Sequence, residues 1–202
     1  MPTISIVDYG VGNLRSVKKA LESAGAKTVV TCDQKDLRNL DAIVLPGVGA
    51  FGEAMKNLLP IAELLKQLIK DGTPTLGICL GLQLLFTKSL EGGKRRGLDL
   101  IKGDVVKLPD TLKLPHIGWN SLEIARDCPL LEDIPNLSYV YFVHSYVPSP
   151  ANRGDGVAYT KYSVKFLSVI ARRNIFGTQF HPEKSSKLGL TILENFVSLS
   201  KR

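Results

Sequence analysis

Short apolar runs alternate with amphipathic segments through the first half of the chain. Such runs are typical of strands that are covered on both faces. They occupy residues 3–7, 42–45 and 75–78, and a further short strand is predicted at residues 27–31. Leu14, Val17, Leu21 and Ala24 recur at three- and four-residue spacing, which predicts an amphipathic helix directly after the first run.

Further helices are predicted after the other runs. Asp33 is a suitable N-cap for a brief helix that ends near Leu40. Residues 53–70 have a helical pattern that Pro60 interrupts, and another helix is predicted from Cys79 through Phe86. This alternation of strands and helices predicts an α/β fold with parallel strands joined by right-handed crossovers.

The second half of the chain is richer in strands. These are predicted at residues 103–108, 121–124, 139–143, 156–162, 168–171 and 175–180. A final helix is expected from about Lys187 to Leu199. Because no repeat or long linker divides the sequence, we expect one domain over residues 1–202.

Three loops follow the predicted parallel strands and are expected to share one cleft. They are residues 9–13, residues 46–49 and the turn at Cys79. Ligands of open α/β sheets bind beyond the carboxyl ends of the strands, so these loops should converge on the functional site. The first loop is a weak match to a dinucleotide-binding motif, because Arg15 stands where the third glycine belongs.

The strongest chemical pattern is Gly77-Ile78-Cys79-Leu80-Gly81, between a predicted strand and a predicted helix. A nucleophile on such a sharp turn requires small neighbours, and glycine stands two residues away on each side. A helix N-terminus at Cys79 would also favour the thiolate. A lone cysteine is more often a small buried apolar residue, but the glycines and the strand-to-helix context favour a nucleophile.

A base and an orienting carboxylate are predicted at His181 and Glu183, directly after an apolar strand. Residues two apart in extended backbone point the same way, so Glu183 can reach one ring nitrogen while the other faces the thiol. Taken alone, His181-Pro182-Glu183 would be a turn at a strand end. The backbone N–H of Leu80 and the loop containing Val48 and Gly49 are candidates for an oxyanion hole, although that loop could equally be a plain turn.

Composition narrows the alternatives. The formal charge of +7 comes from scattered lysines and arginines, and no aromatic residues alternate with them, which argues against nucleic-acid binding. Three widely spaced cysteines argue against a disulfide framework and favour a reducing compartment. The sequence has no apolar run of the ~20 residues that a membrane span needs, no phosphate-binding loop and no clustered metal ligands, so no membrane, metal or cofactor is expected.

With these motifs in view, the sequence resembles the class I glutamine amidotransferases, which use a Cys-His-Glu triad. It is most similar to the family of glutaminase subunits of imidazole glycerol phosphate synthases. The narrower resemblance rests on four further segments, at residues 8–13, 46–51, 115–120 and 141–146. The family implies a flavodoxin-like amidotransferase fold, with a mostly parallel central sheet, flanking helices and a smaller antiparallel strand set.

The resemblance also implies an activity and a partner. Glutamine would be hydrolysed to glutamate and ammonia, and a separate (β/α)8-barrel cyclase would use the ammonia to form imidazole glycerol phosphate and AICAR in histidine biosynthesis. The two chains would form a cytoplasmic heterodimer. Motif matches assign glutamine binding to Gly49, Gln83, Ser145 and Tyr146. They assign the partner interface to Asn13, Trp119, His144 and Lys184.

Three other functions remain open from the sequence. A related amidotransferase subunit, serving anthranilate, guanylate or pyridoxal phosphate synthesis, would share the triad and differ in its partner. A cysteine peptidase or deglycase on a related fold is disfavoured by Gln83 and by the spacing of His181 and Glu183. A silent scaffolding protein is disfavoured because all three triad residues are present.

Overall fold

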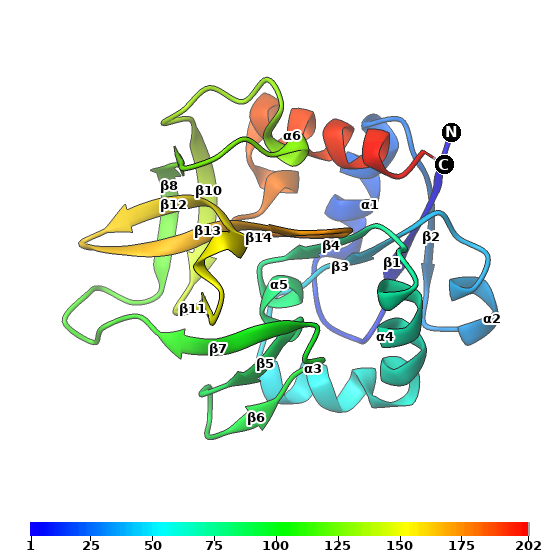
Figure 1. Cartoon of the computed structure of the whole chain (residues 1–202), viewed down its shortest axis with the longest axis horizontal. Helices are drawn as coiled ribbons and strands as arrows, with labels where there is room; N and C mark the ends of the chain where they lie inside the picture. Colours follow the sequence, from blue (N-terminus) through cyan, green and yellow to red (C-terminus); the bar gives the residue numbers. More distant parts are fainter. Residues whose placement is uncertain (202) are drawn as a thin grey trace.

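An eight-stranded sheet forms the centre of the computed structural model, which describes residues 1–201 (Figure 1). Its parallel part is β2 (Lys27–Thr31), β1 (Thr3–Val7), β3 (Ala42–Leu45), β4 (Thr75–Ile78) and β14 (Ile175–Thr178), in that order. Antiparallel β13 (Val164–Arg172), β12 (Gly156–Tyr162) and β9 (Glu123–Ile124) extend it beyond β14. The predicted α/β class and the parallel pairing of the first four strands are confirmed.

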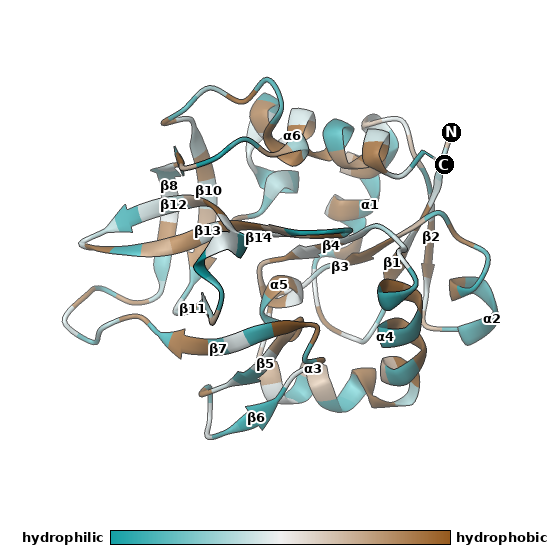
Figure 2. Cartoon of the chain, in the orientation of Figure 1, coloured by the Kyte–Doolittle hydropathy of each residue, from teal (hydrophilic) through white to brown (hydrophobic). Residues whose placement is uncertain are grey.

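Helices cover both faces of the parallel strands. On one face lie α1 (Leu14–Ser23) and α6 (Ser186–Leu199). On the other lie α3 (Phe51–Leu58), α4 (Ala62–Lys70) and the short α5 (Leu80–Leu84). Figure 2 shows hydrophobic residues concentrated in the central strands and on the helices beside them. A brief α2 (Gln34–Leu37) follows β2, with Asp33 as its N-cap.

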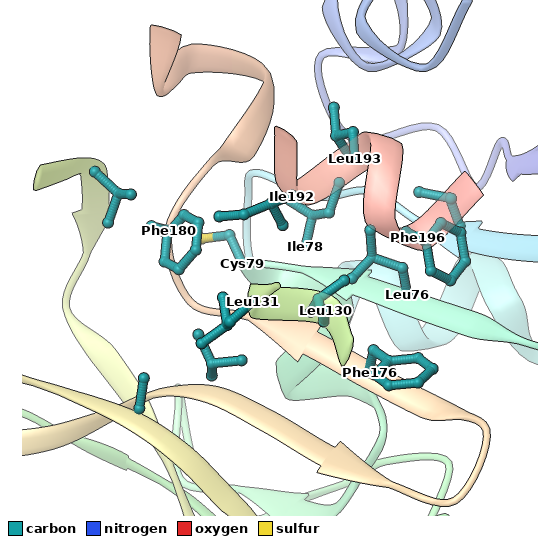
Figure 3. Packing of buried hydrophobic residues seen from close by; sticks show 14 of the residues in the cluster. Leu76, Ile78, Cys79, Leu130, Leu131, Phe176, Phe180, Ile192, Leu193 and Phe196 are labelled. Atoms are coloured by element: carbon teal, nitrogen blue, oxygen red, sulfur yellow. The ribbon is translucent and has the colours of Figure 1, made fainter. Parts of the chain in front are cut away.

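Alternation along each strand divides the interior into two hydrophobic clusters. In β3, Ala42 and Val44 belong to the cluster of α1 and α6, whereas Ile43 and Leu45 belong to the cluster of α3 and α4. Successive strand side chains point to opposite faces, so a four-residue apolar run serves both clusters. Figure 3 shows side chains of the first cluster, among them Cys79 and Phe180.

Two smaller sheets lie beside the main one. One contains β11 (Tyr146–Pro150), β7 (Ile101–Lys107), β5 (Phe86–Ser89) and β6 (Arg95–Arg96). The other pairs β8 (His116–Ser121) with β10 (Tyr139–His144). Single 3-10 turns complete the structure: η1 (Leu59–Ile61), η2 (Pro129–Leu131), η3 (Arg153–Asp155) and η4 (Pro182–Lys184).

The boundaries differ from the sequence prediction in several places, and the brief helix predicted to end near Leu40 ends at Leu37. The helix predicted from Cys79 through Phe86 ends at Leu84, because Phe86 pairs with Ile101 in the four-stranded sheet. β8 begins at His116, five residues before the strand predicted at residues 121–124. The strand predicted at residues 175–180 ends at Thr178. The break at Pro60 is confirmed, as η1 separates α3 from α4. None of the helices within residues 1–201 has the length and apolar character required to cross a membrane.

Candidate active site

Parallel pairing of β4 and β14 brings Cys79 close to His181. Ile78 lies opposite Thr178 in the register, and the Cys79 backbone N–H donates to the Thr178 carbonyl at 2.7 Å. The chain leaves β14 at that point, and the His181 N–H donates to the Tyr141 carbonyl at 2.9 Å. Two residues 102 positions apart in sequence therefore meet at the carboxyl end of the sheet, where the three loops were predicted to converge.

The backbone at Cys79 has the strained conformation of a nucleophile elbow. Its φ is 51° and its ψ is −104°, in a region that residues with a side chain rarely adopt. A side chain at Gly77 would put its Cβ 2.6 Å from the Leu82 backbone, and one at Gly81 would collide with the Leu45 carbonyl. Glycine is thus required at both positions for the turn to pack against its neighbours.

His181 and Glu183 form a buried ion pair beside the elbow. The Nδ1 atom of His181 lies 2.8 Å from Oε1 of Glu183, and both side chains are almost fully buried. The contact is made differently from the prediction, because Glu183 lies in η4 and not in extended backbone. The Ser185 hydroxyl fixes this turn by donating to the His181 carbonyl at 2.7 Å and accepting from the Tyr141 N–H.

The charges of this pair favour a protonated imidazole. Burial alone lowers the pKa of His181, but the neighbouring Cys79 sulfur and Glu183 carboxylate outweigh it and raise the pKa to about 10. The buried Nε2 atom has no hydrogen-bond partner that satisfies normal geometry within residues 1–201. An imidazolium ion held by Glu183 can therefore face the sulfur of Cys79.

The loop after β3 joins the elbow through Gly47. The Leu80 N–H donates to the Gly47 carbonyl at 3.4 Å, and the Tyr9 hydroxyl donates to the Pro46 carbonyl. A Cβ at Gly12 would lie only 3.5 Å from Gly47 Cα, so all three predicted loops do converge. Burial raises the pKa of Tyr9 far above its usual value, which keeps this hydroxyl a donor.

This contact changes the expected oxyanion hole. In a planar trans peptide the C=O and the following N–H point in opposite directions. Because the Gly47 carbonyl points at Leu80, the Val48 N–H points away from the elbow. In this conformation the Leu80 N–H is occupied and the Val48 N–H is turned away.

A cavity of about 290 Å³ opens beside Cys79. The predicted substrate residues Gly49, Gln83, Ser145 and Tyr146 all line it. Gln83 is buried, and its Nε2 donates to the Tyr146 carbonyl at 2.9 Å. The cavity volume lies near the low end of the roughly 300–1,000 Å³ typical of ligand pockets, which suits a ligand smaller than a drug molecule.

The sequence prediction missed other residues around the cavity. Glu91, Pro115 and Val143 also line it, and the Cys79 thiol donates to the Val143 carbonyl at 3.7 Å. The segments that contain Pro115 and Val143 were noted for their resemblance, and Val143 also ends a predicted strand, but neither residue was assigned to the site. No local pattern singled out Glu91. The described residues include no group of three or more histidine, cysteine or acidic side chains arranged to hold a metal ion.

Comparison with known proteins decides the family. The protein-family model described as "Glutamine amidotransferase class-I" matches residues 5–199. The chain belongs to the class-I glutamine amidotransferase family. Within it, the chain is 51% identical over 200 residues to "Imidazole glycerol phosphate synthase subunit HisH" of Caldanaerobacter subterraneus, covering 98% of each chain. It is 52% identical over 196 residues to the HisH protein of Methanocaldococcus jannaschii, covering 97% of this chain and 99% of that one.

Solved structures support the amidotransferase fold at much lower identity. A chain of the PurLQS structure from Thermotoga maritima superimposes with a TM-score of 0.79 at 19% identity, covering 99% of both chains. The glutaminase domain of CTPS from Trypanosoma brucei gives 0.72 at 15% identity, covering 99% of this chain and 94% of that one. The half-identical HisH relatives set this amidotransferase apart from the guanylate, anthranilate and pyridoxal phosphate alternatives and from peptidases.

The expected interface residues of the amidotransferase fall into two groups. Trp119 is 51% exposed on β8, and the exposed Lys184 places its Nζ 6.0 Å from the ring centroid of Tyr141. Asn13 is also exposed and caps α1 by accepting from the Ser16 N–H at 3.4 Å. These three side chains are accessible to a partner.

His144 differs from them, because its side chain is buried. Its Nδ1 lies 3.1 Å from the Tyr146 carbonyl and its Nε2 lies 3.2 Å from Nδ1 of His116. Burial lowers the pKa of His144 to about 3, so the ring is neutral. His144 thus lines the cavity and supports Tyr146, and its assignment to the partner interface stays a prediction.

Proposed function

We propose that this HisH-family amidotransferase hydrolyses glutamine with Cys79, His181 and Glu183 and delivers the ammonia to a separate cyclase chain. The observation that carries the proposal is the buried His181–Glu183 pair beside a cysteine on a positive-φ elbow. Such an arrangement supplies a nucleophile, a base and the group that orients the base. The family membership supplies the substrate class.

The first half of the reaction forms a thioester. The Cys79 sulfur attacks the side-chain carbonyl carbon of glutamine and gives a tetrahedral oxyanion. The protonated His181 then gives its proton to the departing nitrogen, so that ammonia leaves and a γ-glutamyl thioester remains on Cys79. Glu183 stabilises the imidazolium and fixes its orientation throughout.

The second half regenerates the enzyme. The now neutral His181 takes a proton from water, whose oxygen attacks the thioester carbonyl. Collapse of the second tetrahedral intermediate breaks the carbon–sulfur bond and releases glutamate. The Cys79 sulfur leaves as the thiolate beside the imidazolium, so protons and charge balance over the cycle.

Oxyanion stabilisation requires a rearrangement at Gly47. If the Gly47–Val48 peptide rotates, the Leu80 N–H is released and the Val48 N–H turns toward the elbow. Each oxyanion donor contributes about 10²–10³-fold to turnover, so the observed conformation is expected to be slow. The glycines at 47 and 49 permit this rotation, and Gly49 already has a φ of 128°.

Gln83 is proposed to hold the substrate. Both of its contacts, to Tyr146 and to Gln179, use Nε2, which leaves Oε1 to accept a hydrogen bond from glutamine. Gly49, Ser145 and Tyr146, which also line the cavity, would provide further backbone and side-chain groups. The polar groups of glutamine would thereby be satisfied in a partly buried site.

An exposed face of the β8–β10 sheet is proposed as the partner surface. Trp119 lies opposite Tyr141 and Ile117 lies opposite Val143, so these side chains share one face. Ile117 and Tyr139 are 59% and 60% exposed, which leaves an aromatic and apolar patch with Lys184 at its edge. Large exposed patches of this kind mark interaction sites, and this one adjoins the catalytic cysteine through Val143. The resemblance makes the occupant a (β/α)8-barrel cyclase.

The test is the rate of glutamine hydrolysis by the purified chain, alone and with a purified cyclase and the cyclase's ligand. We expect slow hydrolysis alone and an increase of about 10²-fold or more in the loaded complex, because one oxyanion donor has that effect. Hydrolysis of peptides with no glutaminase activity in either condition would contradict the proposal.

A further inference from the structure

Gln179 is a buried polar residue that the proposed mechanism does not use. It stands between β14 and His181 and has no exposed surface. Its backbone N–H donates to the Ser168 carbonyl at 2.9 Å, which fixes the main chain. Its side-chain amide is therefore free to serve another group, and it reaches into the active site.

The direction of the Gln179 amide follows from its neighbours. The Tyr146 carbonyl can only accept, so the Gln83 atom 2.9 Å from it must be the amide nitrogen. That same nitrogen lies 3.2 Å from Gln179, which must present its oxygen. The remaining Gln179 Nε2 then points at the Cys79 sulfur, at 3.5 Å.

We propose that the Gln179 amide is a second hydrogen-bond donor to the Cys79 sulfur, alongside His181. It stabilises the thiolate and ties the position of the sulfur to Gln83, the residue proposed to hold glutamine. This inference rests on the proposed function, since it takes Cys79 as the nucleophile.

The chemistry of an amide suits this position. A carboxylate at residue 179 would repel a thiolate, and an ammonium ion would compete with His181 as an acid. A carboxamide donates a hydrogen bond and keeps its proton at every working pH. Because Gln179 is buried and its oxygen is held by Gln83, its N–H is already oriented before the thiolate forms.

A simpler explanation is that Gln179 only satisfies Gln83 in the protein interior. A carboxylate at this position would repel a thiolate under either explanation, so the two explanations differ in what Gln179→Met does. If the amide only fills space and pairs with Gln83, this thioether should leave the alkylation of Cys79 unchanged. If the amide donates to sulfur, its loss should make the thiolate harder to form.

The experiment is the pH dependence of Cys79 alkylation by iodoacetamide, followed by mass spectrometry of the Cys79 peptide. Peptide-level detection is needed because Cys32 is exposed and would also react. We expect the midpoint to rise by about one pH unit in Gln179→Met and by about two in Gln179→Glu, relative to wild type. Ser168→Ala, which alters a buried hydroxyl on the neighbouring strand, should leave the midpoint unchanged.

Equal midpoints in wild type and Gln179→Met would overturn the inference. Thermal unfolding identifies any variant that fails to fold. Gln179→Asn keeps an amide on a shorter side chain, and its alkylation midpoint is expected to lie between those of wild type and Gln179→Met. Failure of the proposed function has a different outcome, namely glutamine turnover that persists in Cys79→Ala. The two failures are therefore distinguishable.

Discussion

The elbow that follows β4 and the loop that follows β3 lie beside each other, because β3 and β4 are neighbouring strands. They differ in whether their groups already have the orientation that the proposed reaction needs. At the elbow, Cys79 is buried, glycines fit on both sides and His181 is paired with Glu183. In the loop, Val48 is 38% exposed and the Gly47 carbonyl occupies the Leu80 N–H. The proposed nucleophile and base are in place, while the groups proposed to stabilise the oxyanion are not. On this proposal, the orientation of the Gly47–Val48 peptide separates a slow glutaminase from an active one.

The elbow side of this comparison is tested by Glu183→Gln, which removes the charge that orients His181. We expect glutamine-dependent turnover to fall by about 10³–10⁴-fold, because a neutral amide no longer stabilises the imidazolium. Ammonia-dependent turnover of the complex should be unchanged. Glu194→Gln, the same change at an exposed position of α6, is the matched control and should have no effect.

The same variant should change how stability depends on pH. The pKa of His181 is raised from 6.5 to about 10 in the folded chain, so its contribution to the free energy of unfolding is fully present below pH 6.5. That contribution is lost as the pH rises through about 10. Urea unfolding across this range should therefore show a smaller loss of stability in Glu183→Gln, and an identical slope would contradict the ion pair.

The loop side is tested by Val48→Pro, because proline has no backbone N–H to donate. In the complex with cyclase and its ligand, we expect turnover to fall by about 10²–10³-fold. Val48→Ala keeps the N–H and should remain within a few-fold of wild type. If the two variants were equally active, the Val48 peptide would not be an oxyanion donor.

The proposed partner surface is tested by Trp119→Ala. Removal of a central aromatic anchor typically weakens binding by about 1–3 kcal/mol, which corresponds to roughly 5- to 150-fold in Kd. Leu59→Ala is a suitable control, since Leu59 is 66% exposed in η1, outside the patch. Calorimetric titration with the cyclase measures both. Equal affinities would place the interface elsewhere.

Much of this site was predictable from short stretches of sequence. Glycines two residues from Cys79 and a carboxylate two residues from His181 are local patterns with direct physical meaning. Parallel strands such as β3 and β4 were also predictable, because they are short runs that are buried on both faces. The position of β14 in the sheet was not predicted. In the structure, this last strand of the chain lies next to β4.

Other features depend on contacts that no local pattern encodes. β5 and β11 were missed because they are defined by pairing with β7, and Tyr146–Pro150 contains two prolines that disfavour a strand. The orientation of the Gly47 peptide could not be predicted, since glycine permits several. The buried position of His144 follows from the β8–β10 register, and the direction of the Gln179 amide follows from Gln83 and Tyr146.

The central claim is that the sulfur of Cys79 attacks glutamine, and Cys79→Ala tests it most directly in the complex with the cyclase. We predict that glutamine-dependent product formation falls by about 10⁴-fold or more while formation from added ammonia continues at the wild-type rate. Glutamine-dependent turnover near the wild-type level in this variant would contradict the account.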